Sequence, residues 1–256
     1  MARKKLIKNL LATHDPSYII KAVNKSLQRH YLYRHHIRYN LLYNKFVKGF
    51  DEIPDPYTPI MVDPANVRLC GLSYHSNGIL SVSKYTDTGK IVGGDWDLEK
   101  NCPHIKTSPK YRAVLERYKE DKSWEETGIY DELADYIEEY GSIDGCYTER
   151  DLKERYRHID ELYKSIKQNG YYSQRELTNN DPRRAALDEV CLNVGRNGQF
   201  VFGGGGWHRL AIANVLNIDK IPVHVIIRHS GWQKKREEAL EGNLSIEHPD
   251  LNGIDN

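Results

Sequence analysis

The stretch Phe202-Gly203-Gly204-Gly205-Gly206-Trp207-His208-Arg209 joins an apolar run to a helical pattern, and it largely determines the fold that we expect. Upstream, apolar residues alternate over Val190–Val194. The Asn197-Gly198 pair that follows is typical of a hairpin turn, because both residues tolerate the positive φ angles of such turns. We therefore expect the chain to return along Phe200–Phe202. Downstream, the apolar spacing predicts a helix from Trp207 to about Leu216.

A glycine run between a strand and a helix is a recurring architecture of phosphate-binding loops. Glycines let the backbone approach an anion, and the first amides of a helix are unpaired donors at the positive end of its dipole. The predicted phosphate-binding residues are Gly203, Gly204, Gly205, Gly206, His208 and Arg209. The alternative is a hairpin exit that merely turns the chain, because the run matches neither the Walker nor the Rossmann pattern.

Outside this core, short extended runs alternate with longer helical patterns. Extended runs are expected at Ile60–Pro64, Val67–Leu72, Gly78–Ser83, Lys90–Val92 and Ile221–Ile227, and helical patterns at Tyr18–Tyr43, Tyr111–Lys119, Tyr130–Tyr140 and from Thr148 to Gly170. The sequence thus predicts an α/β (α+β) fold with a small mixed sheet. We expect a basic helical segment at 1–52, a domain at 57–235 with a large helical insertion at about 76–150, and a polar tail at 236–256.

Five features, in order along the chain, resemble the ParB/sulfiredoxin superfamily. They are the strand Ile60–Pro64, a helix that ends in Asn169-Gly170, the hairpin, a box at Gly206–Arg209 that opens a helix with small residues, and Ile221-Pro222-Val223. The resemblance covers about residues 60–75 and 151–230. That superfamily includes ParB partition proteins, which bind CTP and DNA, sulfiredoxin, which uses ATP, and free-serine kinases, which use ATP or ADP. The resemblance implies that Gly206, His208 and Arg209 contact the phosphates of ATP or another nucleoside phosphate.

Three departures narrow the resemblance. Trp207 stands where sulfiredoxin has its cysteine, so sulfinic-acid reduction by that route is not expected. The box reads His-Arg, where partition proteins have Arg-Arg, and the 27 residues after His229 are fewer than their helix-turn-helix readers need. The chain is therefore closest in logic to the free-serine kinase branch, which implies a nucleotide-dependent phosphotransferase acting on a small hydroxylated acceptor.

Phosphoryl transfer to a hydroxyl group uses a carboxylate near the acceptor, and usually Mg²⁺ on the phosphates. Two acids follow a glycine pair in Gly93-Gly94-Asp95-Trp96-Asp97. We therefore predict Asp95 and Asp97 as the catalytic residues and as the Mg²⁺ ligands. The alternative is a surface turn in which each aspartate bonds locally.

Three further residues are predicted to contact the substrate or the nucleotide. Gln174 lies in a loop that the resemblance places near the nucleotide, with an ordinary loop contact as the alternative. Arg228 and His229 lie at the exit of the last strand, where Arg228 can bind a phosphate or a substrate acid, with an edge salt bridge as the alternative for Arg228.

Charge is distributed unevenly along the chain. Residues 1–50 carry eleven lysines and arginines against one acid, Asp15, whereas the remainder carries 26 basic and 35 acidic residues. This predicts an attached basic element that binds nucleic acid or an anionic membrane surface, with Arg29, Arg34 and Arg38 as candidate contacts. The alternative is an amphipathic helix that packs on the acidic insertion.

No secretory signal and no transmembrane segment is expected, and the four dispersed cysteines fit a reducing, cytoplasmic setting.

Two alternatives to the kinase function remain. One is a DNA-associated ParB-like module, acting as a nucleotide switch or a nuclease-like element, in which the basic helix grips the duplex. The other is a degenerate domain that serves only as a scaffold.

Overall fold

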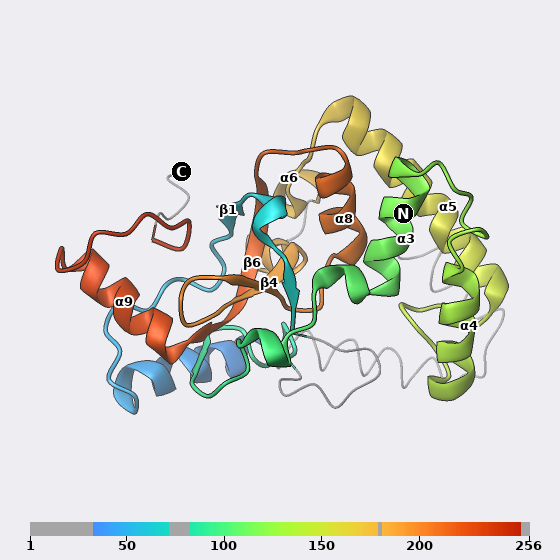
Figure 1. Ribbon diagram of the computed structural model, residues 1–256. Helices are drawn as coiled ribbons and strands as arrows, with labels where there is room; N and C mark the ends of the chain where they lie inside the picture. The colour runs from blue at the N-terminus through green and yellow to red at the C-terminus, as the bar shows by residue number, and fades with distance from the viewer. Residues whose placement is uncertain (1–32, 72–81, 179–180, 252–256) are drawn as a thin grey trace.

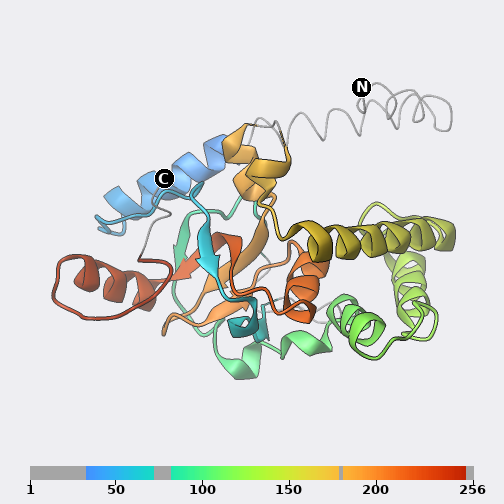
Figure 2. The same ribbon diagram turned by 90° about the horizontal axis from the view of Figure 1, so that it is seen from above.

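The computed structural model describes residues 33–71, 82–178 and 181–251 (Figures 1 and 2). These residues form a mixed six-stranded sheet flanked by helices, so the α/β fold is confirmed. The strands are β1 (Ile60–Val62), β2 (Leu69–Cys70), β3 (Lys90–Val92), β4 (Val190–Val194), β5 (Phe200–Phe202) and β6 (Ile221–His229).

The helices contain the long periodic segments of the sequence. They are α3 (Pro109–Lys119), α4 (Ile129–Tyr140), α5 (Glu149–Asn169), α6 (Gln174–Leu177), α7 (Pro182–Leu187), α8 (Trp207–Val215) and α9 (Ser230–Leu240), together with a helix at residues 33–46. Helices α3, α4 and α5 lie beyond α8, whereas α9 and the helix at 33–46 lie on the other side of the sheet in both views (Figures 1 and 2). Among the described residues, no helix combines the length and the apolar composition needed to cross a membrane.

The long strand β6 is the centre of the sheet. The order is β1-β6-β4-β5-β2, with β4 parallel to β6 and β5 antiparallel to β4. The free edge of β6 is shared by two short strands, β1 at its beginning and β3 at its end. Because β3 belongs to the sheet, the segment expected as a helical insertion at 76–150 is not wholly an addition to the domain.

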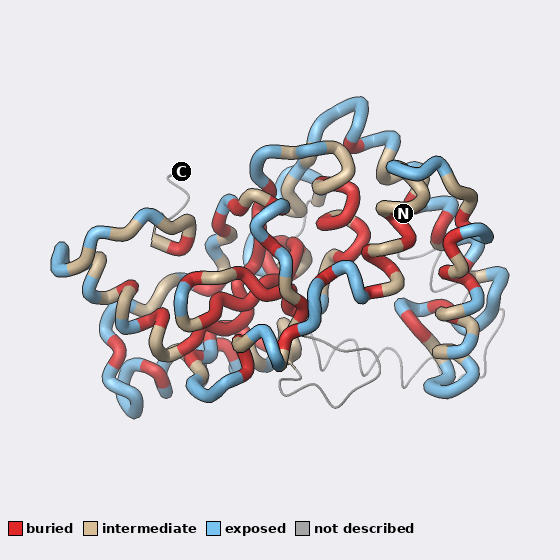
Figure 3. Tube along the Cα trace, viewed as in Figure 1, coloured by how far each residue is buried: buried red, intermediate tan, exposed pale blue. Residues whose placement is uncertain are grey.

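Alternation along the strands places two apolar clusters on opposite faces of the sheet. Leu192 and Val225 belong to the larger cluster, which also contains the buried faces of α3, α4, α5 and α8. Cys191 and Ile226, one position away, belong to the smaller cluster around Trp96. The buried segments concentrate on the sheet and on the faces of the helices that cover it (Figure 3).

The predicted hairpin is present between β4 and β5, with a different turn. Among the turn residues only Gly198 has a positive φ, +85°, and its amide donates to the Gly195 carbonyl at 3.0 Å. A Cβ at Gly198 would lie 2.9 Å from the Trp232 ring, so close packing also requires the glycine.

The described part of the basic segment packs on α7 and on the segment 86–89, which belongs to the first described part of the expected insertion. Tyr33 and Ile37 are buried with Leu187 of α7. Asn40 donates to the carbonyls of Thr86 and Thr88 at 2.9 and 3.0 Å. These amide bonds and the apolar contacts with α7 attach this helix, and Arg34 adds an ion pair with Asp181. The expected helical turns before residue 33, and Arg29 with them, lie outside the described residues.

The segment from residue 236 differs from the polar tail that we expected. Helix α9 continues to Leu240, and Asp250 is only 4 % exposed. The Asp250 carboxylate accepts hydrogen bonds from Arg228 and from Trp232 Nε1, the latter at 2.8 Å. The C-terminal segment up to Leu251 is therefore attached to the sheet through a buried ion pair.

Candidate functional site

The glycine run leaves β5 and lies directly against β4. The amide of Gly203 donates to the Cys191 carbonyl at 2.8 Å, and the amide of Cys191 donates to the Gly205 carbonyl at 2.9 Å. Gly204 and Gly206 have φ angles of +107° and +89°, in the range that favours glycine. A Cβ on Gly206 would lie 3.0 Å from the Val190 Cα, so this loop reaches its position only because it lacks side chains.

The loop ends at the N-terminus of α8 without a side-chain cap. Gly206 occupies the cap position, and no side chain bonds the free amides of the first turn. The amides of Gly204, Gly205 and Gly206 donate no hydrogen bond to another residue in the described ranges. Such amides, together with the helix dipole, attract an anion.

His208 lies in the first turn of α8 and is 8 % exposed. Burial lowers the pKa of His208 to about 3, and the nearby cations Lys110 and Arg155 lower it further, so the ring is neutral at physiological pH. Its Nε2 is buried and has no hydrogen-bond partner among the described residues. A buried polar atom without a partner costs free energy unless a ligand or a water satisfies it. His208 is thus the second feature of this helix start that indicates a ligand.

Arg209 is held by a buried acid, which sequence analysis did not identify. Its Nη1 lies 3.4 Å from Glu189 Oε2, and its Nη2 donates to the Asp188 carbonyl. Glu189 is 1 % exposed, and burial raises its pKa to about 7, although Arg209 and the amide of Gln174 partly offset that effect. The guanidinium therefore belongs to the loop region but is not a free cation.

A cavity of about 1140 Å³ opens in front of this loop. Its lining includes all four glycines of the run, His208 and Arg209, which the structure brings together as the sequence predicted. The opposite walls come from the segment Val82–Thr86 and from one face of α5 with Arg155 and His158. The size suits a ligand of nucleotide dimensions.

Three carboxylates line the cavity, and two of them are already engaged. Burial alone would raise the pKa of Asp144, but ion pairs with Lys110 and Arg155 lower it. Asp151 accepts the amide of Thr148 as part of the cap of α5. Glu154 forms neither a hydrogen bond nor an ion pair with any residue in the described part of the chain, so its carboxylate remains available.

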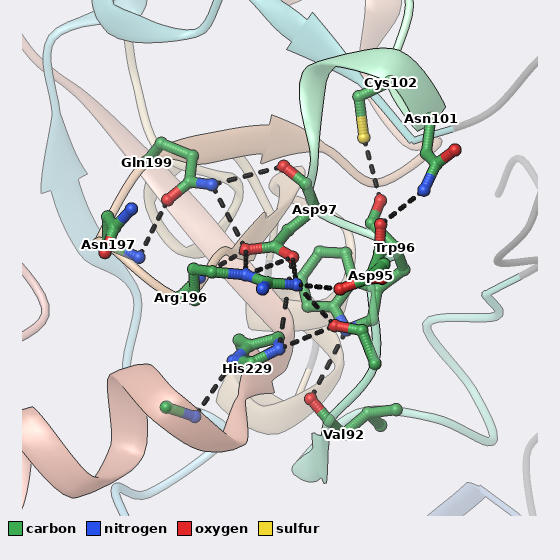
Figure 4. A network of polar contacts seen from close by, with 12 residues as sticks. Val92, Asp95, Trp96, Asp97, Asn101, Cys102, Arg196, Asn197, Gln199 and His229 are labelled. Atoms are coloured by element: carbon green, nitrogen blue, oxygen red, sulfur yellow. Dashed lines mark hydrogen bonds and ion pairs between the residues drawn. The ribbon is translucent and has the colours of Figure 1, made fainter.

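Asp95 and Asp97 lie outside this cavity, at the hairpin end of the β4–β5 pair (Figure 4). Asp97 Oδ2 accepts the Arg196 amide at 2.6 Å, and both carboxylate oxygens contact the Arg196 guanidinium within 3.0 Å. Gln199 Nε2 donates to the same carboxylate at 3.2 Å. Burial would raise the pKa of Asp97, but the bonds from Arg196 hold it below its usual value.

The geometry does not fit the catalytic and Mg²⁺-binding roles that we expected for Asp95 and Asp97. Arg196 already pairs with both carboxylates, because its Nη2 lies 2.9 Å from Asp95 Oδ1 and 2.8 Å from Asp97 Oδ1. Across the described ranges, no three His, Cys, Asp or Glu side chains gather as a metal site would require. The structure instead fits the alternative, in which each aspartate is bonded within the protein, here to Arg196.

The side chains of Arg228 and His229 are also occupied by contacts within the protein. Arg228 forms a bidentate ion pair with Asp250, at 2.8 Å from Nε and 2.5 Å from Nη2. His229 Nε2 lies 2.9 Å from the Gly94 carbonyl, and Nδ1 accepts the amide of Gly231 at the start of α9. Neither residue lines the cavity. Arg228 forms the salt bridge that was its alternative, and His229 bonds backbone groups.

Gln174, which the structure places at the start of α6 and not in a loop, does line the cavity. Its backbone amide donates to Glu189 Oε1 at 2.5 Å, which fixes the carboxylate behind Arg209. The cavity wall also includes Cys191, and burial raises the pKa of its thiol to about 11, so the thiol stays protonated. Trp207 packs on Phe202 with ring centroids 3.8 Å apart.

The two described arginines of the predicted anionic-surface site are exposed. Arg34 forms an ion pair with Asp181, and Arg38 lies one turn further along the helix at 33–46. Neither lines the cavity, so this basic surface is separate from the glycine loop.

Comparisons with protein-family models, with curated proteins and with solved structures found no match to this chain. The site is therefore interpreted from its own geometry.

Proposed function

We propose that this protein binds a nucleoside phosphate, such as ATP, in the cavity and transfers a phosphoryl group to a small hydroxylated acceptor. One observation supports the proposal most directly. Gly204–Gly206, whose amides donate no hydrogen bond to the described residues, and His208, whose buried Nε2 has no partner there, line the same cavity at a helix N-terminus. The resemblance to the ParB/sulfiredoxin superfamily assigns this segment to phosphate binding and agrees with that geometry.

The glycines, His208 and Arg209 would each contribute differently to phosphate binding. The glycine amides donate to phosphate oxygens without the desolvation of a side chain. The His208 ring is neutral at physiological pH, and in the tautomer with its proton on Nε2 it would add an uncharged donor. Arg209 contributes positive potential while Glu189 fixes its orientation.

Transfer requires that an acceptor oxygen attacks the terminal phosphorus while the bond to the bridging oxygen breaks and the acceptor proton leaves. Glu154 is the cavity carboxylate that is free to take this proton. It replaces Asp95 and Asp97 in that role because Arg196 occupies both of those acids. When bound, Mg²⁺ would neutralise phosphate charge, and it commonly uses one or two carboxylates with the phosphates themselves.

Calorimetric titration of ATP, ADP and CTP with and without Mg²⁺ tests binding. We expect at least one nucleotide to bind, and His208→Phe to weaken binding about tenfold, because one hydrogen bond to a charged group is lost. Asp95→Asn is the matched control and should bind as the wild type does. The proposal fails if no nucleotide binds, or if His208→Phe and Arg209→Ala both bind normally.

Product analysis separates transfer from binding alone. We expect formation of ADP from ATP to depend on a hydroxylated acceptor, and Glu154→Gln to lose turnover while retaining nucleotide affinity. Turnover that survives Glu154→Gln would remove this residue from the mechanism without affecting the binding proposal.

A further inference from the structure

A stripe of exposed apolar side chains runs along the helix at residues 33–46 and ends just beyond it. We call it the apolar stripe, and its members are Tyr39, Leu42, Tyr43, Phe46 and Val47. Phe46 is 75 % exposed and Val47 65 %. Five of the eleven exposed large hydrophobic residues in the described part of the chain fall within these nine positions. Single exposed apolar residues are ordinary, but a contiguous group marks an interaction surface.

The apolar stripe is not the face that attaches this helix to the protein. With about 100° between successive residues, positions 39, 42, 43 and 46 share one side of the helix. Ile37, Asn40 and Asn44 are buried on another side, where they contact α7 and the segment 86–89. The helix therefore has one buried side that attaches it to the fold and a separate apolar side that is exposed.

Cations flank the apolar stripe. Arg34, Arg38 and Lys45 are exposed and follow one another along the side of the helix next to Leu42. Residues 33–50 contain no aspartate or glutamate, and residues 1–50 contain only Asp15. An amphipathic helix with Tyr, Phe and Leu on one side and Lys and Arg beside it is typical of segments that lie in a lipid interface.

We propose that the apolar stripe docks on an anionic lipid surface, with its side chains in the headgroup region and Arg38 and Lys45 on the lipid phosphates. A second copy of the chain fits less well, because it would place two acid-free basic faces side by side. Nucleic acid also fits less well, because Leu42 and Val47 have no ring to stack on bases, and burying them gains little there. The proposal is independent of the nucleotide site.

Vesicle co-sedimentation of the full chain tests this inference. We expect sedimentation with vesicles of phosphatidylcholine and phosphatidylglycerol, and much less with phosphatidylcholine alone. The double variant Leu42→Ser/Phe46→Ser should bind the anionic vesicles at least about tenfold more weakly, because two buried apolar side chains are lost. Arg38→Gln/Lys45→Gln should weaken binding about fivefold for each cation and reduce its salt dependence.

The matched control is Tyr140→Ser/Leu240→Ser, which removes exposed apolar side chains elsewhere and should bind vesicles normally. All of these side chains are exposed, so melting temperatures and nucleotide binding should not change. The inference is overturned if the wild type does not sediment with anionic vesicles, or if Leu42→Ser/Phe46→Ser sediments equally well. It is also overturned if light scattering shows that the stripe variant loses only self-association, or if it loses only binding to duplex DNA.

Discussion

The glycine loop and the loop at Asp95–Asp97 both combine glycines with charged residues, yet they differ in how many polar groups remain unsatisfied. Around Asp97, both carboxylate oxygens are used by Arg196, and Gln199 adds a further donor. Around His208, a buried ring nitrogen and several backbone amides have no partner among the described residues. The polar groups of the first region satisfy one another, whereas the second region keeps polar groups that a ligand could satisfy.

The comparison teaches that a pair of acids after glycines is ambiguous until its cationic partner is known. Arg196 lies 99 residues from Asp97 in the sequence, and it reaches the acid because β4 ends beside the loop after β3. In the glycine loop, by contrast, the glycines and the helix start are adjacent in the sequence. The arrangement proposed to bind phosphate can therefore be recognised from one short segment.

The largest effect expected from this comparison is on stability at Asp97. We expect Asp97→Ala to lower the free energy of unfolding by about 3 kcal/mol, because it removes the acceptor that satisfies the Arg196 amide and side chain. Urea unfolding measures the change. Under conditions in which the variant is folded, its nucleotide affinity should equal that of the wild type. A loss of affinity in the folded variant would mean that the Asp95–Asp97 loop contributes to the nucleotide site.

The next effect is a pH dependence of opposite sign in the two regions. Arg196 lowers the pKa of Asp97, so its contribution to stability is present above about pH 4 and is lost as the pH falls through its folded pKa. Burial raises the pKa of Glu189 from 4.5 to about 7, so the folded protein holds the extra proton between these values. Stability from Glu189 therefore decreases as the pH rises from 4.5 to about 7.

Comparison of the wild type with Glu189→Gln isolates this second contribution. The variant, neutral at all pH values, should gain on the order of 3 kcal/mol relative to the wild type across that window. Unfolding measured at several pH values checks the slope. A constant difference between the two proteins would mean that Glu189 is ionised throughout.

Alanine substitutions at two glycines with similar φ angles should have smaller effects that still distinguish the two regions. Gly206 and Gly198 have φ of +89° and +85°, and an added Cβ would meet Val190 or Trp232. Each alanine substitution should cost about 1–2 kcal/mol of stability. Only Gly206→Ala should also weaken nucleotide binding in calorimetry, and equal effects on binding would contradict a local site.

The smallest effect is expected at Asp95. Its side chain is 63 % exposed, so the ion pair with Arg196 is weak in water. We expect Asp95→Asn to change the free energy of unfolding by less than about 0.5 kcal/mol and to leave turnover intact. A large loss of turnover would restore Asp95 as a catalytic residue.

Local signals were sufficient for most elements. The Thr148 cap and Gly170 mark the ends of α5, where the structure shows a capping box between Thr148 and Asp151. The glycine loop, the start of α8 and the strand at Ile221 likewise occupy the predicted positions. Such features depend on residues within a few positions of each other, so they can be predicted from a single sequence.

The sequence alone determined the strand, glycine loop and helix order, because backbone freedom at glycine and amide geometry at a helix start are local properties. Only the tertiary structure decided which charges remain available. It paired Asp97 with Arg196, Arg228 with Asp250 and Arg209 with Glu189, through contacts between segments that the sequence separates. Burial and ion pairing depend on all the surrounding elements at once, and so the free carboxylate of Glu154 and the unpartnered Nε2 of His208 became visible only in the folded chain.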